Sequence, residues 1–248
     1  MKKKKKKKLI LDICIIICAC TFAFSAYKIY EFEKNMQTIE SEQQEVDTII
    51  EEATTTEESR FTKETYDKLK NMNKDYVCYL EFDSQLISLP VVQTDNNDYY
   101  LTHSFKKKSS SQGAIFIDAR NLLTDTNITI YGHYVYADKT KMFSPLSKLK
   151  KQANYENNRL LKLYFEDEVR EYEVAYVYEY DYTETNYDYT KRNFASQEAI
   201  DTFFAYPEKY QYYDTNINIE YGDSFITFQT CVKNQKTKRL IVVAKEKK

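Results

Sequence analysis

After Asp75 the chain alternates between apolar and polar positions, a pattern typical of β-strands. Val, Ile, Tyr and Phe recur at every second residue, the period at which side chains of a strand point to opposite faces. Many short strands with few helices indicate one mainly β domain, built as a barrel or a sandwich. The predicted strands are Tyr76–Phe82, Leu86–Gln93, Gly113–Asp118, Asn127–Gly132, Leu160–Phe165, Glu171–Tyr180, Asn216–Tyr221, Phe225–Thr230 and Arg239–Lys245.

Three other segments follow the helical period instead. Thr62–Asn73 begins with a Thr cap and carries apolar residues at helical spacing, so we expect it to pack against the domain. Phe143–Lys151 is the second predicted helix. Ser196–Tyr206 is the third, with its first residue as the N-cap and Pro207 as its end, because a proline disfavours helical backbone in the residue before it.

The start of the chain is first basic and then apolar. Seven lysines, Lys2–Lys8, precede Leu9–Tyr27, whose 19 residues carry one charge, Asp12. A membrane-spanning helix needs about 20 mostly apolar residues, and flanking lysines favour the cytoplasmic side. We therefore predict a cytoplasmic basic tail at residues 1–8 and an uncleaved transmembrane anchor at residues 9–27, with the rest of the chain outside the cell.

Three other interpretations of this start are open. A cleaved signal peptide has the same basic beginning, but this apolar run is long for one and no clear Ala-x-Ala site is present. The stretch ending at Cys20 faintly resembles a lipoprotein attachment box. A basic nucleic-acid tail is disfavoured, because the lysines adjoin an apolar segment.

Residues 28–60 are rich in Glu, Gln and Thr, and their apolar positions are too sparse for a core. This composition predicts a solvated, partly helical extracellular stalk. Residues 61–248 then form the folded domain, in which we expect any chemistry to lie.

Composition argues against several function classes. A net charge of −2 argues against a general nucleic-acid binder. Three glycines in 248 residues rule out the usual Gly-rich phosphate loops. Most of the 24 tyrosines fall at alternating strand positions, where aromatic packing explains them better than a carbohydrate- or base-stacking surface does.

Cysteine usage singles out one residue. Three of the five cysteines lie in the apolar N-terminal segment, where they behave as small hydrophobic residues. Cys78 lies inside an apolar strand pattern, which predicts a buried, inert thiol, whereas Cys231 lies at a strand end. A disulfide between the two stays open, although a domain of this size does not need one.

The two histidines leave a short list for any mechanism that uses one. His133 follows Gly132, just past a strand that looks buried, where a side chain can face a substrate while its backbone stays rigid. His103 lies in a lysine-rich loop, which favours a surface position. These histidines and the two cysteines of the domain lack the short paired spacing of a zinc site, so we predict no metal site.

A cysteine nucleophile needs a positive charge that favours its thiolate, an acid or base for the leaving group, and a donor for the oxyanion. Cys231 and His133 meet the first two needs in residue type, and Arg239 could supply the donor or the charge. If the Cys231 and Arg239 strands pair through their short connection, the guanidinium returns near the thiol. Taken singly, each residue is more often structural, and spacing alone leaves the two interpretations balanced.

Several stretches of the chain resemble sortases, the cysteine transpeptidases of Gram-positive cell surfaces. "TFQTC" and "RLIVVAK" resemble their Thr-Leu-x-Thr-Cys and Arg-x-Val/Ile-Val segments, and "NITIYGHYVYADKTKMFSPLSKLKK" resembles their His segment. "VVQTDNNDYYLTHSF" and "GAIFIDARN" are similar to upstream strands of class B, and the helix at Ser196–Tyr206 matches the class B insertion before the Cys strand. The resemblance runs from about Arg60 to the C-terminus.

The resemblance implies a closed eight-stranded sortase-type β-barrel with an N-terminal helix and an inserted helix, preceded by one transmembrane helix. Residues 61–248 would be its catalytic domain. Cys231 would attack the Thr carbonyl of a C-terminal sorting signal, NPxTN- or PxTG-like. His133 would serve as acid and base, and Arg239 would stabilise the oxyanion or hold the substrate.

Three further residues are expected to contact the substrate. Thr230 adjoins the nucleophile, and Gln229 and Tyr134 replace smaller residues of the family pattern, so they bear on signal preference. The implied partners are surface proteins with a sorting signal, and peptidoglycan or its lipid-linked precursor as amine donor. The resemblance implies no cofactor.

Two rival functions stay open. One is a cysteine peptidase that hydrolyses the signal, since water and an amine compete for one thioester. The other is a catalytically idle surface adhesin that keeps the barrel and its tyrosines.

Overall fold

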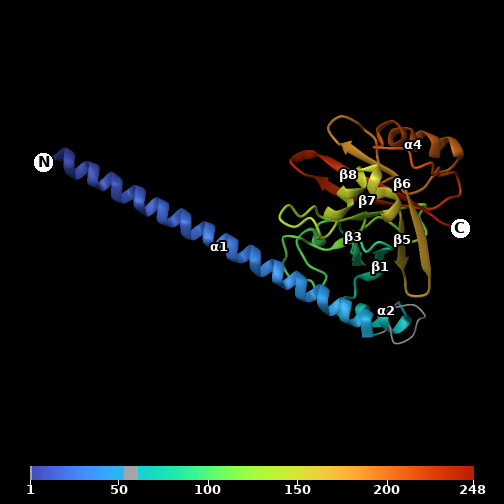
Figure 1. The fold of residues 1–248 in the computed structure, drawn as a ribbon, viewed down its shortest axis with the longest axis horizontal. Coiled ribbons are helices and arrows are strands. Elements are labelled where there is room, and N and C mark those ends of the chain that lie inside the picture. The colour runs from blue at the N-terminus through green and yellow to red at the C-terminus, as the bar shows by residue number, and fades with distance from the viewer. Residues whose placement is uncertain (1, 53–60) are drawn as a thin grey trace. The chain divides into compact units, whose positions relative to one another are not determined.

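The structure is a computed structural model that describes residues 2–52 and 61–248 (Figure 1). It divides into two compact units, Met1–Glu42 and Gln43–Lys248. The last part of the predicted stalk, residues 53–60, lies outside the described residues.

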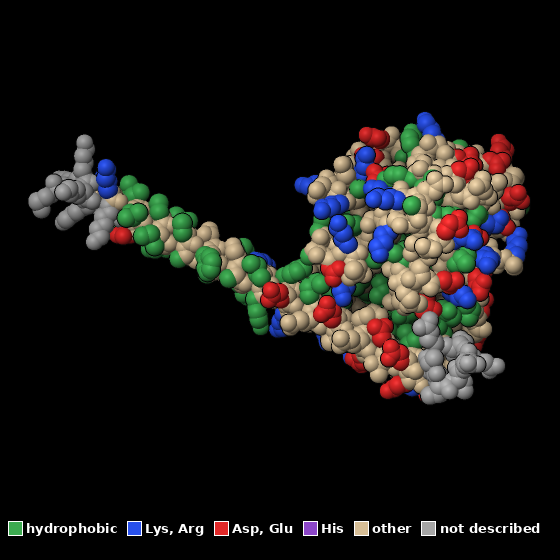
Figure 2. All heavy atoms as spheres, in the orientation of Figure 1, with side chains coloured by type: hydrophobic (Ala, Val, Ile, Leu, Met, Phe, Trp, Pro, Cys, Tyr) green, Lys and Arg blue, Asp and Glu red, His purple; other side chains and the backbone are tan. Residues whose placement is uncertain are grey.

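The predicted anchor is helical and lies within α1 (Lys2–Glu52). The stretch Leu9–Glu52 contains a window with a mean hydropathy of 2.4, and none of that window is buried. Figure 2 shows apolar side chains covering much of this stretch. By length and composition, the helix could therefore cross a membrane.

The last turns of α1 belong to the same compact unit as the barrel. Val46 and Ile50 are buried there, in one apolar cluster with Leu69 of α2 (Lys63–Met72). These two α1 residues lie four positions apart, on one helix face. This stretch is therefore less solvated than its composition suggested.

Helix α2 confirms the prediction for Thr62–Asn73. The hydroxyl oxygen of Thr62 accepts a hydrogen bond from the backbone N–H of Thr65 at 3.2 Å, which is the N-cap contact that the sequence implies. Its apolar face packs on the outside of the barrel, in the cluster that also contains Tyr76 and Tyr79.

Eight strands close into a barrel in the order β1-β2-β3-β4-β7-β8-β6-β5, with β5 paired to β1. The pairs β2–β3 and β4–β7 are parallel, and the other pairs are antiparallel. The predicted closed eight-stranded barrel is confirmed. The strands are β1 (Tyr76–Phe82), β2 (Ser88–Val92), β3 (Ile115–Ile117), β4 (Asn127–Tyr131), β5 (Leu160–Tyr164), β6 (Val169–Asp181), β7 (Phe225–Val232) and β8 (Gln235–Glu246).

The ninth predicted strand, Asn216–Tyr221, is wrong. Asn216 has a φ of +60°, which is left-handed backbone and not that of a strand. Ile219 is buried and Ile217 partly buried in the apolar cluster outside the barrel. The alternation therefore reflects a loop packed against the barrel rather than strand pairing.

The inserted helix is present but longer than predicted. Helix α4 (Gln197–Tyr210) begins at the Ser196 cap, whose hydroxyl accepts from the N–H of Ala199 at 3.3 Å. Pro207 lies inside the helix, and its carbonyl accepts the capping N–H of Gln211 at 2.8 Å. The predicted end at this proline was wrong, because proline lacks a donor but its fixed φ is helical and its carbonyl still accepts.

The remaining helical segments are short. The predicted helix Phe143–Lys151 is present as a 3-10 helix. The segments are η1 (Tyr99–Leu101), η2 (Ser144–Lys150), η3 (Gln152–Asn154) and α3 (Tyr155–Asn158).

Alternation along the strands separates two apolar layers. Ile226 and Phe228 of β7 point into the barrel, with Val242 of β8. Phe225 of β7 and Ile241 of β8 point outward into a second cluster, which α4 covers (Figure 1). A residue's place in this alternation therefore decides whether it faces the core or the outer surface.

Candidate active site

The parallel pair β4–β7 places His133 level with Cys231. Tyr131 lies opposite Gln229 at the end of the β4–β7 ladder, and the N–H of Gly132 donates to the carbonyl of Gln229 at 3.1 Å, which extends the ladder past the end of β4. His133 and Cys231 each follow two residues after this pair. The same register therefore brings both residues to one rim of the barrel.

The antiparallel pair β7–β8 adds Arg239 to the same rim. Cys231 lies directly opposite Arg239, so the two side chains share one face of the sheet. The predicted return of the Arg239 strand through its short connection is confirmed. His133 follows the end of β4, Cys231 lies one residue before the end of β7, and Arg239 lies opposite Cys231 within β8.

The two cysteines of the domain lie in opposite environments, and both are free thiols. Cys78 is fully buried in the barrel interior, and this burial raises the pKa of its thiol well above the usual range. Cys231 is partly exposed and alternates with the inward-pointing Val232. Of the two, Cys231 is the thiol that a substrate can reach.

His133 is partly exposed and is held by a backbone carbonyl. Its Nε2 atom lies 2.8 Å from the carbonyl oxygen of Leu101 in η1. The other histidine, His103, is also partly exposed, and its ring stacks on Tyr99 at a centroid distance of 4.1 Å. The two rings therefore have different neighbours, and His133 is the one level with Cys231 in the β4–β7 register.

Arg239 is held by backbone carbonyls at the start of β8. Its Nη1 atom donates to the carbonyls of Lys236 and Lys238, both at 3.0 Å. The guanidinium lies 5.1 Å from the ring centroid of Tyr182, a cation–π distance. Within residues 2–52 and 61–248, Arg239 makes no ion pair with a carboxylate, so its charge can act on an anionic group of a substrate.

The three predicted substrate contacts have different positions. Gln229 is partly exposed, and its Oε1 accepts a hydrogen bond from the hydroxyl of Tyr189 at 3.4 Å. Thr230 is fully buried opposite Leu240, in the inward set of residues, so a contact with substrate would come from its backbone. Tyr134 is 8% exposed and packs edge-on against Tyr136. Of the three, only Gln229 alternates in phase with Cys231 along β7.

Within the described part of the chain, no group of three or more His, Cys, Asp and Glu side chains could hold a metal ion. The register brings together the thiol of Cys231, the imidazole of His133 and the guanidinium of Arg239. By their chemistry, these three groups can act as a nucleophile, an acid or base, and a hydrogen-bond donor.

A family model, the sortase domain, matches residues 80–247. The chain belongs to the sortase family. It is 29% identical to the sortase B of Listeria monocytogenes over 236 residues, which is 90% of this chain and 91% of the relative. It is also 29% identical to the sortase B of Staphylococcus aureus over 184 residues, 73% of each chain.

Solved structures agree with this assignment. The crystal structure of Clostridium perfringens sortase B is similar with a TM-score of 0.67 and 30% identity, covering 74% of this chain and 100% of that one. A substrate complex of Staphylococcus aureus sortase B shares the fold, with a TM-score of 0.73 and 24% identity over 87% of this chain and 97% of that one. The protein is a class B sortase, and sortases are cysteine transpeptidases.

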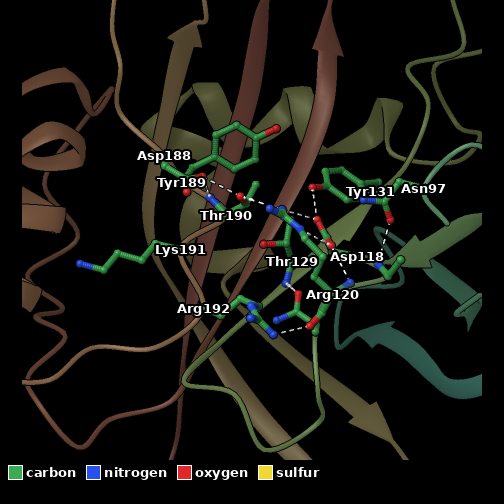
Figure 3. Close-up of polar contacts among 12 residues, drawn as sticks. Asn97, Asp118, Arg120, Thr129, Tyr131, Asp188, Tyr189, Thr190, Lys191 and Arg192 are labelled. Carbon is green, nitrogen blue, oxygen red and sulfur yellow. Dashed lines mark hydrogen bonds and ion pairs between the residues drawn. The ribbon is translucent and has the colours of Figure 1, made fainter. Parts of the chain in front are cut away.

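In this sortase, a cluster that the sequence analysis missed holds the β6–β7 connection over the outer face of the barrel. Figure 3 shows Arg120 between Asp118 and Thr190. Nε and Nη2 of Arg120 donate to the two carboxylate oxygens of Asp118 at 2.9 and 2.8 Å, and Nη2 also donates to the hydroxyl of Thr190 at 2.9 Å. Arg120 therefore ties the β3–β4 connection to the β6–β7 connection. No spacing rule in the sequence marks these contacts.

Asn127 secures the same connection from β4. It is fully buried, and its Nδ2 atom donates to the carbonyls of Tyr189 and Lys191 at 3.0 and 2.9 Å. The hydroxyl of Thr227 donates to its Oδ1 at 2.8 Å. Asn127 thereby fixes the backbone of Tyr189 above the residues of β7 that lead to Cys231.

Tyr189 is a neutral donor at this position. Burial raises its pKa to about 12, so its phenol keeps its proton at neutral pH. Its ring packs edge-on against Tyr180 at 5.2 Å, and Tyr180 lies opposite Arg239 in the β6–β8 pair. Tyr189 thus borders the outer surface that Gln229 and Arg239 share.

Asp118 is the carboxylate that accepts the hydrogen bonds of Arg120 in this cluster. Burial alone would raise its pKa, but hydrogen bonds from the side chain and backbone of Arg120 and from the hydroxyl of Tyr131 hold it well below the usual range. Asp118 is therefore ionised at neutral pH, and the fold stabilises that charge.

We expect Asp118→Ala to lower the free energy of unfolding by about 2–3 kcal/mol at pH 7, because the Tyr131 hydroxyl loses its acceptor and Arg120 loses its partner. The Arg120 side chain is 57% exposed, so solvent screens part of the ion pair. The folded pKa lies below the unfolded one, so this stabilisation is present above about pH 4 and is lost as the pH falls below it. Urea unfolding followed by near-ultraviolet circular dichroism measures it.

The control for this variant is Asp67→Ala, which removes an exposed carboxylate of α2 and should change stability by less than about 0.5 kcal/mol. An equal loss in both variants, or a loss in Asp118→Ala that grows below pH 4, would contradict the assignment.

Proposed function

We propose that this sortase cleaves the C-terminal sorting signal of a surface protein after its Thr residue and joins the protein to an amino group of peptidoglycan. The observation that carries the proposal is the row formed by the His133 strand end, the outward-facing Cys231 and Arg239 directly opposite it. The sorting signal is NPxTN- or PxTG-like.

The reaction takes place in two balanced steps. The Cys231 thiolate attacks the Thr carbonyl carbon, and Arg239 stabilises the oxyanion. The carbon–nitrogen bond then breaks as His133 gives a proton to the departing amine, which leaves a thioester on Cys231. In the second step the acceptor amine attacks the thioester, His133 takes its proton, and the carbon–sulfur bond breaks to restore the thiolate.

The amine acceptor is peptidoglycan or its lipid-linked precursor, and the enzyme works on the outer face of the cell membrane. Residues 1–8 form the cytoplasmic tail, residues 9–27 the anchor, residues 28–60 an extracellular stalk and residues 61–248 the catalytic domain. The apolar stretch of α1 and the lysines before it support this arrangement. It places the enzyme beside a membrane-held substrate and the wall precursor.

Signal preference depends on the residues around the nucleophile. The side chain of Gln229 lies on the outer surface beside Tyr189, so it is the substrate contact with the strongest support. Tyr134 directly follows His133, and its ring packs on Tyr136. This packing would shape the surface beside His133. Thr230 contributes its backbone beside Cys231.

The test incubates the full chain with NPxTN- and PxTG-type peptides, with and without a short amine acceptor, and separates the products by mass. We expect a peptide–amine product whose yield rises with the amine concentration. Release of free carboxylate at a rate that does not depend on the amine concentration would instead identify a hydrolytic peptidase. Absence of cleavage and of any thioester on Cys231, across both peptide types, would favour the non-catalytic adhesin.

A further inference from the structure

The contact between His133 and Leu101 decides which ring nitrogen carries a fixed proton. The Nε2 atom lies 2.8 Å from the Leu101 carbonyl oxygen. A carbonyl oxygen can only accept a hydrogen bond, so Nε2 must be the donor. The other nitrogen, Nδ1, is then the site at which the ring can lose or gain a proton.

We propose that η1 is the positioning element of the catalytic histidine: its Leu101 carbonyl holds His133 as the Nε2–H tautomer, so that the proton exchanged with the substrate moves through Nδ1. The link to catalysis rests on the acid–base role proposed for His133 above. The tautomer itself is a property of the resting protein and does not depend on that role.

Gly113 allows η1 and His133 to come this close. It has a φ of +62°, and a Cβ atom there would lie 2.2 Å from the Tyr100 carbonyl oxygen, 3.1 Å from that of Leu101 and 3.2 Å from Cδ2 of His133. Both the left-handed backbone and the lack of space therefore require glycine. The next residue, Ala114, donates its N–H to the Tyr100 carbonyl at 3.0 Å, which joins the start of β3 to η1.

The middle residue of η1 is anchored in the protein. Tyr100 is 1% exposed. Its hydroxyl donates to Asp75 at 2.9 Å and accepts from Nδ2 of Asn73 at 2.7 Å. Because these partners lie at the end of α2 and the start of β1, the Leu101 carbonyl is held by the scaffold rather than by a free loop.

His103 provides an internal comparison for the tautomer of His133. Its Nδ1 atom lies 2.8 Å from the carbonyl oxygen of Tyr99, at the other end of η1. The same argument makes Nδ1 the donor in this ring, although the Thr102 hydroxyl also lies 3.2 Å from it. The only two histidines of the protein are thus expected to be opposite tautomers.

The experiment is solid-state ¹⁵N NMR of the full chain in lipid, without a histidine tag and with ¹⁵N in the histidine rings only. At about pH 9, where ordinary imidazoles are neutral, we expect one ring protonated at Nε2 and one protonated at Nδ1. The His103→Gln variant should remove the second set of signals and so assign the first to His133. An Nδ1–H or mixed tautomer for His133 would overturn the proposal.

Gly113→Ala tests the role of η1, with Gly222→Ala as the matched control. Gly222 also has a positive φ, +94°, but a Cβ atom there meets nothing within 4 Å. Both variants strain the backbone, and only Gly113→Ala displaces the carbonyls of Tyr100 and Leu101. We expect a mixed His133 tautomer and a fall in kcat of about 10- to 100-fold for Gly113→Ala, with KM and the His103 signals little changed, and neither effect for Gly222→Ala.

Tyr100→Phe is the second variant. It removes only a hydroxyl, so it should fold even if Gly113→Ala does not. It should shift the His133 tautomer in the same direction and to a smaller extent. A single, unchanged Nε2–H tautomer in every folded variant would overturn the role of η1. Since the tautomer is read without substrate, a chain that has the expected tautomers but does not transfer peptides would refute the proposed function and leave the positioning intact.

Discussion

Cys231→Ala is expected to abolish the thioester with a sorting peptide and to lower product formation by at least about 10³-fold. The variant removes the only thiol of the barrel unit that faces outward, and neither His133 nor Arg239 can replace a covalent nucleophile. Intact-protein mass spectrometry after incubation with the peptide detects the adduct, and chromatography of the peptide products measures the rate.

Cys78→Ala is the matched control, since it removes the other thiol of the same unit. That side chain is fully buried in the barrel interior, so the variant should keep the adduct and most of the rate. We expect it to cost about 1–2 kcal/mol of stability through the small cavity that it leaves. An adduct that survives in Cys231→Ala and disappears in Cys78→Ala would refute the nucleophile assignment.

Arg239→Ala is expected to lower kcat by about 10²- to 10³-fold, the usual cost of removing one oxyanion donor. The guanidinium is held by two backbone carbonyls and lies near the ring of Tyr182, so it is already oriented before a substrate arrives. Arg239→Lys keeps the charge but lacks the planar set of donors, so it should recover only part of the rate. Single-turnover and steady-state kinetics with the preferred peptide would separate kcat from KM.

Lys238→Ala is the control for Arg239, because it removes the same charge from the next residue. The Lys238 ammonium lies 3.9 Å from a carboxylate oxygen of Glu179, and we expect its loss to change the rate by less than about fivefold, as for a screened surface charge. If both alanine variants lose activity equally, the rim would act through its overall positive field and not through a specific donor.

Much of the fold could be predicted because strand alternation is local. Tyr76–Phe82 was predicted with its observed bounds, and the other strands of the barrel to within a few residues. The helix after Thr62 was marked by its cap. In each case the signal is the side-chain period or a capping residue, and neither depends on distant parts of the chain.

The errors arise where a local pattern has more than one physical cause. Ile217 and Ile219 alternate because they pack on the outer cluster beside α4, although their segment pairs with no strand. Pro207 looked like a helix end, but the capping bond from Gln211 carries α4 one turn further. Val46 and Ile50 looked isolated, and they are buried because α2, β1 and several later segments of the barrel unit supply the rest of their cluster.

For the candidate site too, some features follow from the local sequence and others depend on the tertiary structure. The sequence by itself determined the residue types of the rim, the place of Cys231 at the end of a strand and the short connection that returns Arg239 beside it. Only the tertiary structure decided that β4 and β7 pair in parallel, which brings His133 level with Cys231. It also decided that Leu101 and Gly113 fix the histidine ring, and that Thr230 faces inward. Such contacts join segments far apart in sequence, and they depend on barrel closure, which no local period encodes.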